Sequence, residues 1–164
     1  MPDWFLGTLL GALLMYVATL LERRFNIKKQ RERFFKALFE EVKLNHSVAR
    51  RFREQYGAGE WTVFDAAPLH SLAYQNTRAS GELSVLASDT LSLLETTYEL
   101  IHAHNRQVTA IVSDSGTAAT VANGVTTVPL PMRRDRGLRE RVGEIEPNLK
   151  RLEEDFPAQL RYLR

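Results

Sequence analysis

Four histidines and two short acidic runs are the side chains whose type and spacing could support chemistry in this 164-residue chain. They are His46, His70, His102, His104, Glu40-Glu41 and Glu153-Glu154-Asp155. His102 and His104 lie two positions apart on an expected helix, so they point about 200° apart and cannot hold the same metal ion. The acidic runs are most simply the solvated faces of helices.

The motifs of common catalytic and cofactor sites are missing from the sequence. There is no Cys, which excludes disulfides, thiolate zinc sites and a cysteine nucleophile. There is no HExxH motif, no repeated Glu-x-x-His pattern and no GxSxG motif. Residues 113–117 lack both the glycine spacing and the lysine of a phosphate-binding loop. We therefore expect no enzyme activity, no metal, no cofactor and no small-molecule substrate.

The N-terminal residues are the most apolar part of the chain. From Trp4 to Leu21 there are 18 residues without a charge, of which 14 are apolar. As a helix they span about 27 Å, close to the bilayer core of about 30 Å. A cleaved signal peptide fits less well, because only Asp3 is charged before the run and no Ala-x-Ala motif follows it. The sequence predicts a transmembrane anchor over residues 1–21.

The charges after the apolar run predict the orientation of this anchor. Six basic residues follow the run and none precedes it: Arg23, Arg24, Lys28, Lys29, Arg31 and Arg33. The positive-inside rule then places the N-terminus outside and residues 22–164 in the cytoplasm, at the inner (plasma) membrane. The same six cations are candidates for lipid head-group contacts. Gly7 and Gly11 form a GxxxG pair, a candidate for helix self-association in lipid.

Nucleic acid is not an expected partner. The basic clusters at 23–36 and 133–141 are the only candidates, but the first adjoins the expected membrane segment. Neither has an aromatic pattern suited to stacking on single strands. The lipid bilayer, together with a protein partner or a second copy of the chain, is the expected partner.

The remainder predicts an all-α bundle of long helices. Apolar or semi-polar residues recur at helical spacing in three segments, within 22–56, 89–112 and from about Asp135 onward, and in the first two the steps alternate between three and four. Their positions are Phe35, Leu38, Val42, Asn45, Ala49, Phe52 and Tyr56; Leu91, Leu94, Tyr98, Ile101, Asn105, Val108 and Val112; and Leu138, Val142, Ile145, Leu149, Leu152, Phe156 and Leu163. The first segment is expected to continue directly from the membrane helix.

The connections between these helices are less regular. Pro68 suits the first turn of a short helix running to about Arg78, and Leu83 and Leu86 belong to a further turn. Residues 113–132 favour a mobile loop, although Asn123-Gly124 is a hairpin signal. Pro147 and Pro157 are expected to kink or restart the last helix.

Charge and polar seam positions indicate how the helices pack. Residues 22–56 carry 11 basic and 5 acidic side chains, whereas residues 57–132 carry 2 and 7. This asymmetry favours an antiparallel packing in which the second long helix folds back against the first. Asn45 and Asn105 occupy seam positions in the two helices, where they could hydrogen-bond to each other and fix the register.

Several of these residues resemble a pattern seen elsewhere. One block is Glu41-Val42-Lys43-Leu44-Asn45, and a second comprises Tyr74, Ser80-Gly81-Glu82-Leu83, Leu86, Leu91, Leu94, Tyr98, Ile101 and Asn105. The chain thereby resembles a group of small prokaryotic single-span proteins, to which no activity is assigned, whose N-terminal anchor continues into a helix with Glu-(Val/Ile)-x-x-Asn. The resemblance implies the architecture and a prokaryotic setting, and it implies no site.

The function that these patterns favour is a membrane-anchored cytoplasmic helical module that acts by binding, as a scaffold or interaction partner. One alternative is an effector or enzyme subunit whose site forms only on assembly. Another is an oligomeric membrane-perturbing protein built on Gly7 and Gly11.

Overall fold

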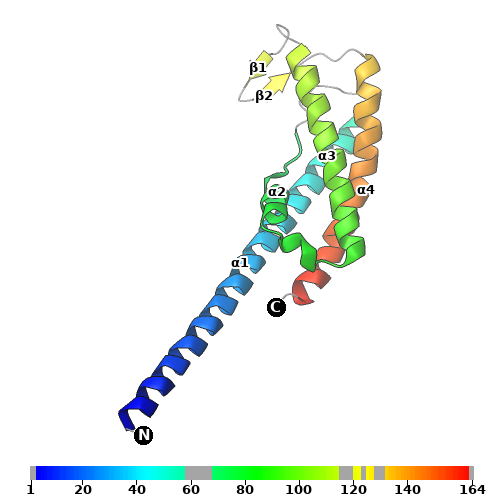
Figure 1. The fold of residues 1–164 in the computed structure, drawn as a ribbon. Coiled ribbons are helices and arrows are strands. Elements are labelled where there is room, and N and C mark those ends of the chain that lie inside the picture. Colours follow the sequence, from blue (N-terminus) through cyan, green and yellow to red (C-terminus); the bar gives the residue numbers. More distant parts are fainter. Residues whose placement is uncertain (1–2, 58–67, 115–119, 123–124, 128–131, 163–164) are drawn as a thin grey trace.

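The computed structural model describes residues 3–57, 68–114, 120–122, 125–127 and 132–162. Within the long N-terminal helix, side-chain surroundings are described from Leu10 to Glu54. In chain order the elements are α1 (Asp3–Gly57), α2 (Leu72–Ala79), the 3-10 helix η2 (Glu82–Val85), α3 (Ser88–Asp114), β1 (Thr120–Ala122), β2 (Val125–Thr127) and α4 (Met132–Tyr162) (Figure 1). The packed part of the described chain is helical.

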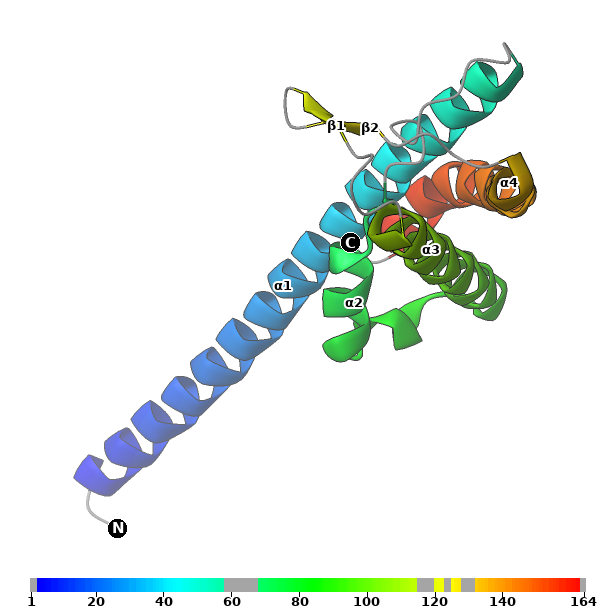
Figure 2. The ribbon, with the colours of Figure 1, turned by 90° about the horizontal axis from the view of Figure 1, so that it is seen from above.

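The core lies where the second half of α1 meets α3 and α4. Its buried side chains repeat at helical spacing along all three helices and include Phe35, Leu38, Val42, Leu94, Ile101, Leu138, Ile145, Leu149, Leu152 and Phe156. Every predicted seam residue whose side chain is described is buried or half-buried, which confirms the three seams. The side chains of Tyr56, Val112 and Leu163 lie outside the described part. Figure 2 shows α2, α3 and α4 gathered on one side of α1.

The direction of α3 differs from the prediction. Glu41 and Phe52 of α1 contact Tyr98 and His104 of α3, in the same order along both helices, so α3 crosses α1 in the same general direction and is not its antiparallel partner (Figure 1). The antiparallel partner of α1 is α4, because His46 contacts Glu153 and Arg53 contacts Glu146.

The reason is the return of the chain before α3. Arg31 of α1 pairs with Glu82 of η2 at 2.5 Å, so by residue 82 the chain has returned toward the N-terminal end of the packed part of α1. Helix α3 then starts at Ser88 and runs back toward the C-terminal end of α1. Gly81 permits this turn, since its φ of 75° lies in the left-handed region that glycine adopts without strain.

Other predictions fare differently. Helix α2 begins at Leu72, so the prediction that Pro68 starts it is wrong. Helix α4 is one α-helix through Pro147 and Pro157, so it does not restart at either proline. Strands β1 and β2 pair antiparallel with Ala122 opposite Val125, the hairpin pairing that Asn123-Gly124 signals. Residues 123 and 124 themselves lie outside the described part.

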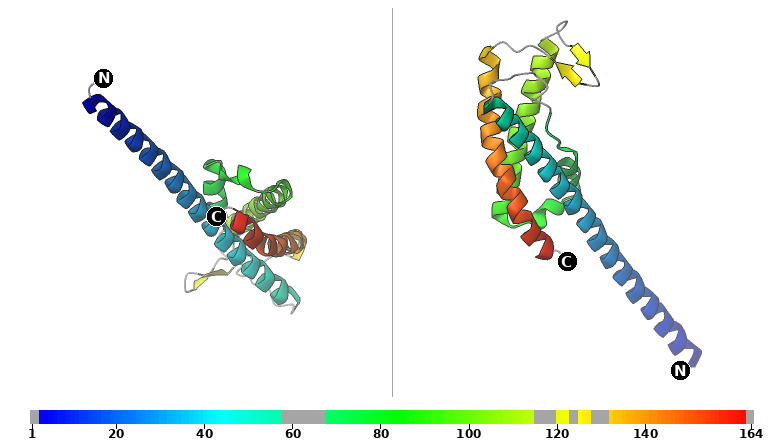
Figure 3. Two further views of the ribbon diagram at one scale, coloured as in Figure 1. Left: turned by 90° about the horizontal axis from the view of Figure 1, so that it is seen from below. Right: turned by 180° about the vertical axis from the view of Figure 1, so that it is seen from behind.

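The first half of α1 projects away from the bundle (Figures 1 and 3). It is part of a single helix of 55 residues, as the sequence predicts for the apolar run and the segment 22–56 that follows it. Large apolar side chains are exposed along it: Leu10, Leu13, Leu14, Met15, Tyr16, Val17, Leu20, Leu21, Phe25 and Ile27. Among the described residues, none of the helices combines the length with the apolar character that a bilayer-crossing segment requires.

Candidate functional site

The two seam asparagines hold one short segment of backbone between α1 and α3. Asn45 Nδ2 donates to the His70 carbonyl at 2.7 Å, and its Oδ1 accepts from the His70 N–H at 2.8 Å. Asn105 makes the same pair of bonds with Leu69, at 2.7 and 2.8 Å. The side-chain amides of Asn45 and Asn105 therefore do not bond to each other, contrary to the prediction. Both have a structural role, and they bind the backbones of two adjacent residues, His70 and Leu69.

These two pairs of amide–backbone hydrogen bonds, which we call the asparagine clamps, explain why residues 68–71 are not helical. The N–H groups of Leu69 and His70 donate to side-chain amide oxygens and their C=O groups accept from side-chain amide NH₂ groups, so the backbone groups of both residues are satisfied outside a helix. Residues 68–71 have no regular secondary structure, and α2 starts immediately after Ser71.

Glu41 of α1 caps the start of α2. Ser71 is the N-cap residue, but its side chain makes no capping bond. Instead the Glu41 carboxylate accepts from the Ala73 N–H at 2.7 Å and the Tyr74 N–H at 3.1 Å. These are N–H groups of the first turn, which have no helical partner and attract negative charge. The prediction of a solvated face is wrong for Glu41, whose residue is 8% exposed.

A tyrosine pair completes the surroundings of Glu41. The Tyr98 hydroxyl donates to Glu41 Oε1 at 2.7 Å, and the rings of Tyr74 and Tyr98 stack with centroids 4.1 Å apart. Burial, together with the adjacent Glu41 carboxylate, raises the pKa of Tyr98 well above its ordinary value. Burial also raises the pKa of Tyr74. Both hydroxyls therefore stay protonated at neutral pH, and Tyr98 remains a hydrogen-bond donor.

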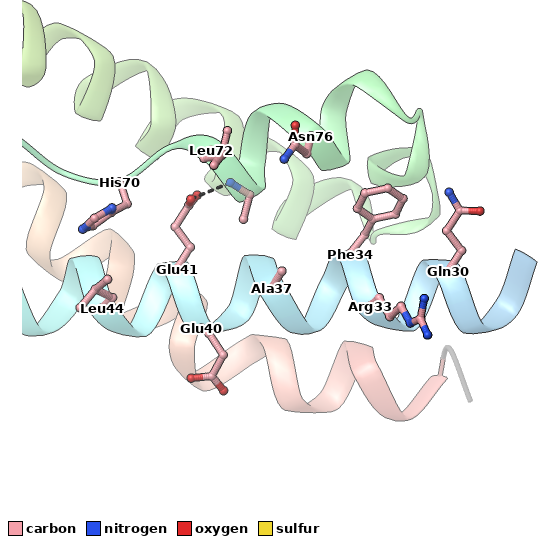
Figure 4. Close-up of a pocket in the computed structure, with 11 residues that line it drawn as sticks. Gln30, Arg33, Phe34, Ala37, Glu40, Glu41, Leu44, His70, Leu72 and Asn76 are labelled. Carbon is pink, nitrogen blue, oxygen red and sulfur yellow. Dashed lines mark hydrogen bonds between the residues drawn. The ribbon is translucent and has the colours of Figure 1, made fainter.

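A groove of about 670 Å³ opens beside this capped helix start (Figure 4). We call it the α1–α2 groove. On the α1 side its residues recur every three or four positions, on one helix face. The lining is Gln30, Arg33, Phe34, Ala37, Glu40, Glu41 and Leu44 of α1, with His70, Leu72, Ala73 and Asn76 opposite. Leu72 is 69% exposed and Leu44 is 46% exposed, so apolar surface is presented in the groove.

The histidines do not gather into a site. His46 lies between two glutamates of α4, with its Nδ1 2.5 Å from Glu153 and its Nε2 3.6 Å from Glu146. Arg53 also bonds to Glu146, at 2.7 Å. These contacts tie α1 to α4. In the part of the chain that the structure describes, no group of three or more potential metal-ligating side chains is placed to hold an ion.

The six basic residues after the apolar run are separated by the structure. Arg31 pairs with Glu82, and Arg33 lines the α1–α2 groove. The other four, Arg23, Arg24, Lys28 and Lys29, are exposed on α1 below the bundle. Gly7 and Gly11 both lie in α1, and a Cβ added at Gly11 would meet nothing within 4 Å. The surroundings of Gly7 are outside the described side chains.

Comparisons with protein families, with curated proteins and with solved structures give no match for this chain. The resemblance to the prokaryotic single-span proteins thus stays a prediction. The groove and the role of Glu41 were missed by the sequence reasoning. One signal was available in the sequence, because Glu41 lies four residues before the seam position Asn45, one turn along the same expected helix.

Proposed function

We propose that this protein is a single-pass membrane protein whose cytoplasmic helical module binds a partner protein at the inner membrane surface. In this proposal residues 1–21 are the anchor, the N-terminus is outside, and residues 22–164 are cytoplasmic. The module acts by binding and has no catalytic role of its own. The observation that carries the proposal is the projecting first half of α1, in which residues 10–21 are exposed, carry no charge and present apolar side chains on every face.

The apolar side chains of this segment cover every face of the helix. The five consecutive residues 13–17 turn through about 400° at 100° per residue. Their exposed fractions lie between 43% and 76%. A protein neighbour would cover one stripe of such a helix, whereas lipid covers all of it. The expected span begins at Trp4 and the described side chains begin at Leu10, so these side chains represent twelve of its eighteen residues.

The α1–α2 groove is the surface best suited to a partner. Its α1 wall extends from Gln30 to Leu44, about 21 Å along the helix axis. An amphipathic helix that lays its apolar face into such a groove makes contacts at this spacing. Arg33 and Glu40 stand on the groove wall with opposite charges, which favours one orientation of a charged partner helix.

The position of the groove indicates the kind of partner. A helix lying in it runs alongside α1, and α1 points toward the proposed membrane. We therefore assign the groove to the juxtamembrane amphipathic helix of another membrane protein. The carboxylate of Glu41 supports a binding role over a catalytic one, because its oxygens already accept from Ala73, Tyr74 and Tyr98.

Alkaline carbonate extraction tests the anchor. Full-length protein with an intact N-terminus should stay in the membrane pellet. A variant with Leu13→Glu and Val17→Glu should move to the supernatant, because charges at the centre of a span are costly. Recovery of the unmodified protein in the supernatant would overturn the membrane proposal.

Site-specific photo-crosslinking tests the groove. A photoreactive residue at Leu72 should crosslink in native membranes to a peptide within about 15 residues of another protein's apolar span. Ala37→Arg should abolish this adduct by filling the groove, whereas Val85→Arg, an exposed position on η2 outside the groove lining, should not. An adduct with a second copy of this chain, with a soluble protein, or with none would overturn the assignment.

A further inference from the structure

The stretch of α1 between the apolar segment and the bundle is a solvent-exposed stalk. Leu21 ends the apolar run, and Phe35 is the first fully buried residue of α1. The 14 residues from one to the other raise the helix by about 21 Å. All residues from 22 to 30 are exposed. We call residues 22–30 the stalk.

The stalk carries two pairs of cations at two heights. Arg23 and Arg24 lie about 3–5 Å above Leu21, and Lys28 and Lys29 lie about 10–12 Å above it. The head-group layer on each side of a bilayer is about 5–8 Å thick. Helical side chains slope toward the helix N-terminus, which is the membrane side here. Both pairs therefore reach the level of the lipid phosphates.

The distribution of these cations around the helix favours lipid over other anions. At 100° per residue, Arg23, Arg24, Lys28 and Lys29 spread over about 240° of the helix circumference. A nucleic acid or an acidic protein contacts one side of a helix. Head groups surround a membrane helix on all sides, so only they can meet the whole set at once.

Two apolar side chains lie between the cation pairs. Phe25 is 67% exposed and Ile27 is 52% exposed, at about 6–9 Å above Leu21. Apolar groups among cations at this depth are typical of a segment in the membrane interface. The remaining two cations lie beyond the stalk, where Arg31 pairs with Glu82 and Arg33 lines the groove.

We propose that Arg23, Arg24, Lys28 and Lys29 form a collar that binds the phosphates of anionic lipids in the cytoplasmic leaflet. Arg31 and Arg33 do not belong to it. This inference rests on the membrane anchoring in the proposed function. The shared chemistry is phosphate, and the assigned source is lipid rather than a free anion.

The test uses full-length protein in nanodiscs of phosphatidylcholine, with or without 30% phosphatidylglycerol, and native mass spectrometry of the retained lipids. Changing all four collar residues to Gln should lower the apparent affinity for phosphatidylglycerol, by about five-fold per cation. The matched control changes four exposed cations of the bundle to Gln: Lys43, Arg50, Arg51 and Lys150. The control has the same net charge and should keep the wild-type affinity.

Several results would overturn the collar. One is an equal loss in both variants, which would indicate a general charge effect. Another is competition by inorganic phosphate at millimolar concentration, which would indicate a free-anion site. A third is an oligonucleotide affinity lost in the collar variant alone. A protein that resists carbonate extraction but shows no preference for phosphatidylglycerol refutes the collar only, whereas release by carbonate refutes both proposals.

Discussion

Replacing Glu41 by alanine should strongly destabilise the bundle. The carboxylate accepts three hydrogen bonds, from the N–H groups of Ala73 and Tyr74 and from the Tyr98 hydroxyl. A bond to a charged group contributes about 1.5–3 kcal/mol, and the three are not additive because they share one acceptor group. Glu41 is 8% exposed but lines the α1–α2 groove, so water that enters from the groove recovers part of this loss. We expect the free energy of unfolding to fall by about 3–4 kcal/mol.

Glu40→Ala is the matched control for this measurement. It removes the same side chain one position earlier, where the side chain is 60% exposed and 3.7 Å from Lys43. It should cost less than about 0.5 kcal/mol. The assay is urea unfolding of full-length protein in a mild detergent, followed by circular dichroism at 222 nm with linear extrapolation. If Glu41→Ala costs no more than Glu40→Ala, the capping role is wrong.

Three further predictions concern the same bundle. Asn45→Ala should lower the free energy of unfolding by about 2–3 kcal/mol, because it leaves an N–H and a C=O of His70 without their partner, whereas the exposed Asn76→Ala should change it by less than about 0.5 kcal/mol. Burial and a neighbouring carboxylate raise the pKa of Tyr98, so only the unfolded state loses this proton near pH 10. Stability is therefore full below about pH 10 and falls above it. Tyr98→Phe should make the alkaline decline of the unfolding free energy shallower by up to about 1.4 kcal/mol per pH unit; an unchanged decline would contradict the buried, neutral tyrosine. In thermal unfolding, Gly143→Ala should stabilise the open helical position by about 0.5–1 kcal/mol, and Gly81→Ala should destabilise the left-handed turn by about 1 kcal/mol; the opposite signs would refute the assigned backbone conformations.

The helices and their buried faces could be predicted because the residues on a buried helix face are apolar and recur in the sequence at helical spacing. Phe35, Leu38 and Val42 repeat at the spacing of a helix face, and that face is buried. The same logic identified Asn45 as structural, since a polar residue on an apolar face must find a partner. Its partner could not be predicted, because it is backbone, and every residue offers backbone N–H and C=O groups.

No comparable sequence pattern predicts the direction of α3 or the role of Glu41. Net charge indicates which segments attract each other, but the level at which the chain re-enters the bundle depends on the turn at Gly81 and the contact of Arg31 with Glu82. In the sequence, Glu41 belongs to an acidic pair and therefore resembles a surface residue. Its burial follows from where α2 begins, which in turn follows from the two asparagine clamps.

The uninterrupted helix through the stalk has a mechanical consequence. No residue of α1 between Leu21 and Phe35 is a glycine or a proline, so the chain has no hinge there. In the proposed membrane arrangement, a rigid lever of about 21 Å that tilts by about 20°, a common tilt for membrane helices, displaces its upper end sideways by about 7 Å. Rotation of the lower end likewise turns the wall that carries Arg33 and Glu40 by the same angle. A change in the tilt or rotation of the N-terminal segment therefore moves the groove wall, and with it the proposed binding surface, by a corresponding amount.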